Sequence, residues 1–187
     1  MTREEYSAFI AKVAPENARY ILCCEEITEG FERAERYRKD GKPELADMVE
    51  QRVIERITIF NRTTLTPATV KVGDGVTINL WSDRHAATVI KVTAKTVTVR
   101  RDKATLNPDF KPEFIPGGFA AHCTNQSEQS YTYEPDEKGE VTTFHWSDKF
   151  QRYGQPGNLT LSKGRHEFYD YNFYEVRHGK EIDRGTD

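Results

Sequence analysis

The chain contains no hydrophobic segment that could cross a bilayer, which takes about 18 or more consecutive apolar residues. Its first ten residues, MTREEYSAFI, lack the apolar stretch of a secretory signal. Cysteine is scarce: Cys23, Cys24 and Cys123 form an odd set without the spacing of a disulfide framework, which is typical of reduced thiols. We therefore expect a cytoplasmic protein with no membrane partner.

The short motifs that mark common catalytic centres are also missing. The sequence has no Walker loop, no dinucleotide-binding glycine fingerprint and no Gly-x-Ser-x-Gly elbow. Its cysteines and histidines show none of the C-x-x-C, H-x-x-x-H or H-E-x-x-H spacings of metal sites. We therefore expect no enzyme and no cofactor. The metal-ligand candidates, which only the fold could bring together, are His122, Cys123, His145 and His166.

The chain has no net positive charge, but its basic residues are concentrated locally. With 27 Lys/Arg and 30 Asp/Glu the formal charge is −3. This charge argues against a protein that coats nucleic acid non-specifically, because such proteins rely on positive potential. Residues 84–111, however, hold seven Lys/Arg and two Asp. Residues 128–140 then hold five acids and one lysine. The basic stretch predicts either a binding surface or a face that the acidic stretch neutralises.

The first third of the chain has the periodicity of helices. Thr2 and Glu5 fit a capping box at the start of the first helix. The sequence DGKP predicts a turn between two longer helices, since Gly41 suits a left-handed cap and Pro43 suits a helix start. We expect residues 1–62 to form a helical hairpin region, through which two copies of the chain could pair as a homodimer.

After the helical region the apolar residues alternate with polar ones, as in strands that bury one face. The segment TVIKVTAKTVTVRRD predicts a hairpin in which Val92 lies opposite Val97 and Ile90 lies opposite Val99. We expect residues 63–176 to form an antiparallel barrel-like domain.

Three further features complete this domain. Residues 105–118 hold three prolines and two glycines and predict a long ordered loop over the barrel. Residues 130–146 predict a second hairpin around DEKG, and residues 165–176 predict a final aromatic strand. Residues 177–187 have the character of a frayed tail. The predicted fold class is α+β: an N-terminal helical hairpin followed by a small antiparallel β-barrel with a long Pro/Gly loop and extra strands.

Part of this domain resembles a known kind of barrel. A Gly-Asp-x-Val-x-Ile start occupies residues 73–78, and alternating strands follow at residues 87–92 and 97–99. This order is similar to the opening of small barrels of the KOW and Tudor type, although KOW segments normally carry a glycine where this chain has Ala86-Ala87. The resemblance implies a small barrel and, more distantly, a nucleic-acid contact.

A larger part, residues 72–173, resembles small uncharacterised proteins encoded by phages and mobile elements of Gram-positive bacteria. The stretches that carry this resemblance include GDGVTINLWSDRHAATVIKVTAKTVTVRRDKA and KGRHEFYDYNFYE. The resemblance implies an accessory protein that acts on host or phage machinery, as anti-CRISPR and other anti-defence inhibitors do. It transfers no catalytic residue.

The predicted function is that of a non-enzymatic accessory protein that binds and inhibits or modifies a nucleic-acid-handling complex of the bacterial host. The basic side chains expected to meet phosphate or an acidic partner surface are Arg84, Lys91, Lys95, Arg100, Arg101 and Lys103. The aromatic side chains expected to anchor a protein from an exposed strand face are Tyr169, Tyr171 and Phe173. A direct DNA- or RNA-binding module is the first alternative, and a metal-assisted hydrolase is the second.

Overall fold

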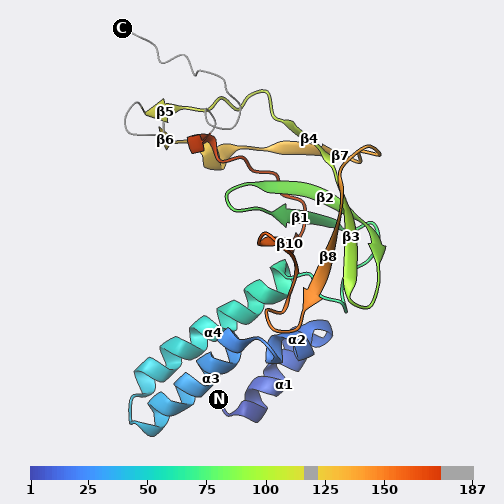
Figure 1. Ribbon diagram of the computed structural model, residues 1–187. Helices are drawn as coiled ribbons and strands as arrows, with labels where there is room; N and C mark the ends of the chain where they lie inside the picture. Colours follow the sequence, from blue (N-terminus) through green and yellow to red (C-terminus); the bar gives the residue numbers. More distant parts are fainter. Residues whose placement is uncertain (116–121, 174–187) are drawn as a thin grey trace.

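The computed structural model describes residues 1–115 and 122–173, in which a helical region is followed by a closed β-barrel and two small sheets (Figure 1). The predicted α+β class, with helices first and an antiparallel barrel second, is confirmed. The tail predicted at residues 177–187 lies outside the described residues. Within them, no helix is both long and apolar enough to cross a membrane.

The helical region is built as its capping residues predict. Its elements are α1 (Arg3–Val13), η1 (Pro15–Asn17), α2 (Ala18–Leu22), α3 (Glu25–Lys39) and α4 (Pro43–Thr63). The Thr2 hydroxyl accepts the Glu5 N–H and the Glu5 carboxylate accepts the Thr2 N–H, which completes the capping box. Gly41 takes a φ of 72° between α3 and α4, so the predicted hairpin turn is confirmed.

The helices share one apolar core and meet the barrel at one of its ends. The core is formed by Tyr6, Ile10, Ala14, Ile21, Ile27, Phe31, Val53 and Ile57. The amide of Asn17 donates to Asn61, and the hydroxyl of Thr66 donates to Asn17. The ring of Tyr20 packs edge-on against Trp146 of the barrel, with ring centres 5.2 Å apart. The contact between Tyr20 and Trp146 packs the helical region against the barrel end that is lowest in Figure 1.

Six antiparallel strands close the barrel in the order β1-β10-β9-β8-β3-β2. They are β1 (Gly75–Asn79), β2 (Arg84–Val92), β3 (Thr96–Arg101), β8 (Val141–Ser147), β9 (Arg152–Gln155) and β10 (Leu159–Lys163). Alternate residues point inward, and the interior is filled by Val76, Ile78, Val89, Val97, Val99, Phe144, Tyr153 and Leu161. The remaining alternate positions form the outer wall.

A bulge in β2 changes the predicted register. Val92 lies opposite Val97 as predicted, but the register shifts between Val89 and Lys91, so that Val89 lies opposite Val99. The predicted Ile90–Val99 pair is therefore wrong. An uninterrupted alternation cannot turn both Val89 and Val92 toward the core because they are three residues apart, and the extra bulge residue removes this conflict.

The hairpin predicted at residues 130–146 is also wrong. Two small sheets lie beside the barrel: β4 (Lys103–Leu106) pairs with β7 (Tyr131–Glu134), and β5 (Phe114–Ile115) pairs with β6 (His122–Cys123). Since β4 follows β3 after one residue, the two form a long bent strand whose partners are β8 and β7. Residues 135–140 loop out at the bend. A Cβ on Gly139 would lie 2.0 Å from the Arg101 carbonyl oxygen, so this crossing requires glycine.

Two other segments differ from their predictions. Residues 105–118 are not one loop over the barrel, because they include the end of β4 and the whole of β5. The described part of the predicted aromatic strand, residues 165–173, is not a strand: Phe168 makes one isolated bridge with Arg84, and Tyr171–Phe173 form the short 3-10 helix η3. Residues 174–176 lie outside the described residues. The backbone N–H groups here donate to side chains instead of to a neighbouring strand. Those of Tyr169, Asp170 and Tyr171 donate to the side chains of Gln129, Asp83 and Gln126, respectively.

Candidate functional site

One row of residues crosses the outer wall of the barrel at right angles to the strands. His145 on β8 lies opposite Gly154 on β9, which lies opposite Thr160 on β10, and Thr160 lies opposite Asn79 on β1. Residues directly opposite one another share a face of the sheet. The residues next to this row along the strands, such as Phe144, Tyr153 and Leu161, point into the barrel core, so the row itself faces outward. Gly154 has no side chain, so the middle of the row is hollow.

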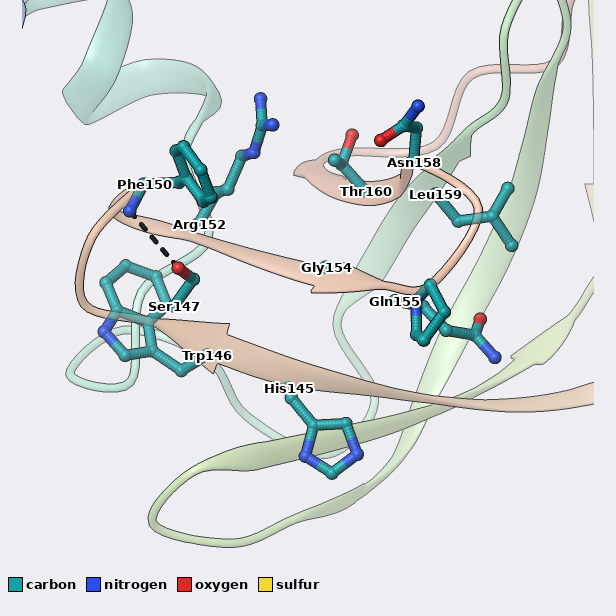
Figure 2. A pocket seen from close by; sticks show the side chains of 11 residues that line it. His145, Trp146, Ser147, Phe150, Arg152, Gly154, Gln155, Asn158, Leu159 and Thr160 are labelled. Atoms are coloured by element: carbon teal, nitrogen blue, oxygen red, sulfur yellow. Dashed lines mark hydrogen bonds between the residues drawn. The ribbon is translucent and has the colours of Figure 1, made fainter.

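A groove of about 470 Å³ occupies this hollow, and we call it the wall groove (Figure 2). It is lined by His145, Trp146, Ser147, Phe150, Arg152, Gly154, Gln155, Pro156, Asn158, Leu159 and Thr160. Figure 2 shows Phe150 and Arg152 close together, at the opposite end of β9 from Gln155. Most of the polar side chains along it are uncharged amides and hydroxyls.

The turn between β8 and β9 presents Phe150 to solvent, with 60% of the residue exposed. The Phe150 N–H donates to the Ser147 hydroxyl, and Gln151 adopts a left-handed φ of 48°. The charged ends of Lys149 and Arg152 lie 5.3 Å and 5.4 Å from the centre of the Phe150 ring. Phe150 is therefore an exposed flat ring with two cations against it, on a turn whose conformation is fixed by local hydrogen bonds.

The wall around the groove is strongly basic. Residues 75–101 and 141–163 contain eight Lys/Arg and two Asp. Of the two acids, Asp83 is buried and Asp148 accepts the Trp146 indole N–H. The eight basic residues are Arg84, Lys91, Lys95, Arg100, Arg101, Lys149, Arg152 and Lys163. Within residues 1–115 and 122–173, only Arg101 of these eight forms an ion pair with a carboxylate.

Three of the predicted basic residues are exposed on the barrel, and none of them lines the groove. Lys91 is exposed on β2 opposite Thr98, on the outer face. Lys95 is exposed in the β2–β3 turn, and its carbonyl accepts the N–H of Trp146, which lines the groove. Arg84 is exposed at the far edge of the wall, with its guanidinium carbon 5.4 Å from the centre of the Phe168 ring. Arg84 and Lys91 lie on β2, three strands from β9 with its Arg152, so of these three cations only Lys95 has a contact with a groove residue.

The other three predicted basic residues are partly or wholly engaged within the fold. Arg100 is half-buried, and its Nε is buried without a hydrogen-bond partner in the described part of the chain. Lys103 lies on β4, away from the barrel wall, 3.8 Å from Glu134. This is one ion pair between the basic and acidic stretches, as the neutralisation alternative predicts.

Arg101 belongs to a buried network around Glu167. The Glu167 carboxylate accepts the Ala86 N–H at 2.7 Å, and its other oxygen lies 3.0 Å from His85 Nδ1 and 3.3 Å from an Arg101 nitrogen. The same Arg101 nitrogen donates to the Tyr169 hydroxyl at 2.9 Å. Burial by itself raises the pKa of the Glu167 carboxyl, but the hydrogen bonds from His85 and Ala86 outweigh it and hold this pKa below its usual range.

The predicted aromatic anchors hold this segment in place instead of facing solvent. Tyr171 is only 8% exposed, and Tyr169 is half-buried against Arg101. Burial raises the pKa of the Tyr169 hydroxyl. The side chain of Phe173 lies outside the described part of the structure. The prediction of an exposed, alternating aromatic face is therefore wrong for Tyr169 and Tyr171, because the segment is not a strand.

The predicted metal-ligand candidates are divided among three parts of the fold. His122 and Cys123 are on β6, His145 is on β8, and His166 follows β10 with its ring stacked on Phe168. No group of three or more metal-binding side chains is found among the residues that the structure describes. Burial raises the pKa of the Cys123 thiol, which is the wrong direction for a nucleophile.

The groove itself was not predicted from the sequence. Phe150 and Arg152 lie in the segment KFQRYGQPGN, which reads as a turn between strands. The signal available in the sequence is the aromatic residue Phe150 with a basic residue on either side, Lys149 before it and Arg152 after it. Its significance depends on Gly154, and only the pairing of β9 with β8 and β10 shows that this glycine opens a groove.

Comparison with known proteins gives no match to a protein-family model, to a curated protein or to a solved structure. The resemblances to KOW and Tudor barrels and to phage proteins therefore stay predictions. The function has to be inferred from the wall and its groove.

Proposed function

We propose that this protein is a nucleic-acid-binding module that holds a single strand on the barrel wall, with one base in the wall groove. The observation that supports this best is Phe150, exposed between two cations at the rim of a groove on a wall with many unpaired basic side chains. Proteins that bind single strands combine a basic surface for the backbone with exposed rings on which bases stack.

Each part of the site has a role on this proposal. Phe150 supplies the face for stacking, and Lys149 and Arg152 meet the adjacent phosphates. Lys95, whose carbonyl accepts the Trp146 N–H, adds positive potential next to the groove, and Lys91 adds to the positive charge of the barrel as a whole. Hydroxyl and amide groups in the groove offer hydrogen bonds to base edges. A duplex fits this arrangement poorly, because its bases are already stacked and paired.

The proposal places direct binding ahead of the predicted inhibition of a host complex by protein contact. On that other hypothesis the same cations would meet an acidic protein surface, and the aromatic residues near 170 would anchor it. The buried position of Tyr171 supports direct binding over this version of a protein interface. An anti-CRISPR-like role in the bacterial cytoplasm stays a prediction.

Fluorescence anisotropy with labelled single-stranded DNA, single-stranded RNA and duplex DNA tests the proposal. We expect both single strands to bind more tightly than the duplex at low salt. Phe150→Ala should weaken binding about 5- to 150-fold, since stacking on an aromatic ring contributes about 1–3 kcal/mol per base. Arg152→Ala should reduce the slope of log affinity against log salt by about 0.7. Arg33→Ala, which removes an exposed charge from α3, is the matched control and should change neither quantity.

Two results would contradict the proposal. One is the absence of binding to any of the three probes at low salt. The other is binding that is unchanged in both Phe150→Ala and Arg152→Ala, which would place the nucleic acid elsewhere on the molecule. In either case a pull-down with the purified protein would test the protein-partner hypothesis next.

A further inference from the structure

Trp81 is the most exposed large apolar residue in the described part of the structure, with 96% of its surface open. It lies in the tight turn between β1 and β2, which is closed by a hydrogen bond from the Leu80 N–H to the Asp83 carbonyl. A fully exposed tryptophan contributes nothing to the core, and its apolar surface stays in contact with water. Because the turn is hydrogen-bonded, the ring is displayed from a defined position.

The outward row through the wall groove leads to this turn. From Thr160 the row passes to Asn79, the last residue of β1, and from Asn79 to Arg84, the first residue of β2. Residues 80–83 connect these two, so Trp81 lies at the end of the row that begins at His145. Four strand spacings separate β8 from β2 along this row, which is about 19 Å at about 4.8 Å per strand when measured along the backbone. Because the six-stranded barrel is closed, the row curves around about two thirds of its circumference.

The surface along this path is suited to a polyanion. Asn79 and Thr160 are neutral polar residues at its centre, with the Asn79 amide donating to Thr160 and Ser162. Arg84 marks its far end and has no carboxylate partner among the described residues, just as Arg152 marks the near end without one. A stacked single strand rises about 3.4 Å per nucleotide, so the path takes about five or six stacked nucleotides and fewer when the strand is extended.

We infer that Trp81 is a second stacking platform, and that one strand crosses the wall from Phe150 to Trp81 with Arg84 and Arg152 on its phosphates. The inference rests on the proposed function and adds the direction and length of the bound strand. It assigns a role to a residue whose exposure the fold does not explain. It also requires that a short oligonucleotide, which reaches only one ring, binds differently from a long one.

Intrinsic fluorescence reports directly on this contact. The chain has two tryptophans, and the second, Trp146, is half-buried, packs edge-on against Tyr20 and Tyr153, and donates to Asp148. Trp146 also lines the wall groove, so its emission can respond to a base bound there. The quench that reports on Trp81 is the part of the solvent-exposed emission that is lost in Trp81→Phe. Trp81→Phe should remove that component while keeping an aromatic surface for stacking.

The decisive experiment measures the affinity of unlabelled oligothymidylates of about three and about ten nucleotides by competition against a labelled strand. Trp81→Ala should weaken the longer oligomer about 5- to 150-fold and leave the shorter one nearly unchanged, since stacking is lost only where the strand spans both rings. Trp81→Phe should recover most of that affinity. Met48→Ala, which truncates an exposed apolar residue on α4, is the control and should have no effect.

The failure of this inference is distinguishable from that of the proposed function. If the wild-type protein binds no oligomer, the proposed function and the path are both overturned. If it binds and Phe150→Ala weakens binding while Trp81→Ala does not, the path is overturned and the proposed function remains. A loss in Trp81→Ala that is equal for both lengths would also overturn the continuous path, because it would place the short oligomer on Trp81 itself.

Discussion

Replacing Glu167 tests whether residues 165–173 are fixed to the barrel by the buried Glu167 carboxylate. Glu167→Ala removes the acceptor of the Ala86 N–H and leaves His85 and Arg101 without their carboxylate. Removing one partner of a buried pair costs about 3–5 kcal/mol. Because the Arg101 side chain is 35% exposed and can regain water, we expect a loss of about 2–4 kcal/mol in the free energy of unfolding. Glu167→Gln keeps an acceptor for Ala86 and should cost about 1–2 kcal/mol.

The pH dependence has a defined sign. The pKa of Glu167 is lower in the folded chain than its usual unfolded value of about 4.3, so the folded chain binds fewer protons there and stability rises with pH. Its contribution is complete above about pH 5 and is lost as the pH falls through the folded pKa. The stability difference between the wild-type protein and Glu167→Gln should therefore shrink on acidification below about pH 4.

Urea unfolding measures the global effect, and hydrogen exchange at the Ala86 amide measures local release of the segment. Glu137→Ala removes an exposed carboxylate that has no ion pair within the described residues, and it should stay within about 0.5 kcal/mol of the wild-type value. The reasoning is refuted if Glu167→Ala unfolds at the wild-type urea concentration and the Ala86 amide keeps its protection.

Two further predictions concern the helical region. Glu50 accepts hydrogen bonds from Arg38 and Tyr6, which lower its pKa to about 2; Glu50→Gln should cost about 1–3 kcal/mol at neutral pH, and urea unfolding should show this difference fading between about pH 4 and pH 2. A Cβ on Gly30 would lie 2.4 Å from a methyl of Val53, so Gly30→Ala should lower stability by about 1–3 kcal/mol through overpacking. Thermal unfolding should show partial recovery in Gly30→Ala/Val53→Ala, and an unchanged Tm in the single variant would contradict the close packing.

Features with local determinants are the ones that the sequence predicts correctly. The capping box at Thr2, the left-handed Gly41 and the short β2–β3 turn each depend on residues within a few positions of one another. The hairpin at residues 130–146 fails because its strands pair with β3 and β4, which lie 25 to 49 residues earlier, and no local signal specifies this pairing. The strand prediction fails for residues 165–173 for the same reason, because their backbone N–H groups donate to side chains distant in the sequence instead of to a neighbouring strand.

The sequence predicts the exposure of a side chain on the barrel only where the alternation of inward and outward strand residues determines it. Lys91 is a polar residue among inward valines, so its position on the outer wall follows from the strand period. Arg101 has the same local appearance, yet it is held by Glu167, which lies 66 residues later. Trp81 and Phe150 are large aromatic residues, which composition alone assigns to a core. Their exposure depends on turns that place them beyond the packed barrel.

The net charge of −3 does not describe the charge of the barrel surface on which the proposed binding site lies. Residues 1–62 contain 13 Asp/Glu and residues 128–140 contain five, whereas residues 75–101 and 141–163 contain two. The α3–α4 hairpin extends away from the barrel (Figure 1), and a helix the length of α4 spans about 30 Å. Since the Debye length is about 10 Å at 0.1 M salt, most of the helical acids are screened from the wall. A strand approaching the barrel therefore meets its exposed basic residues, and its affinity depends on these cations more than on the charge of the whole chain.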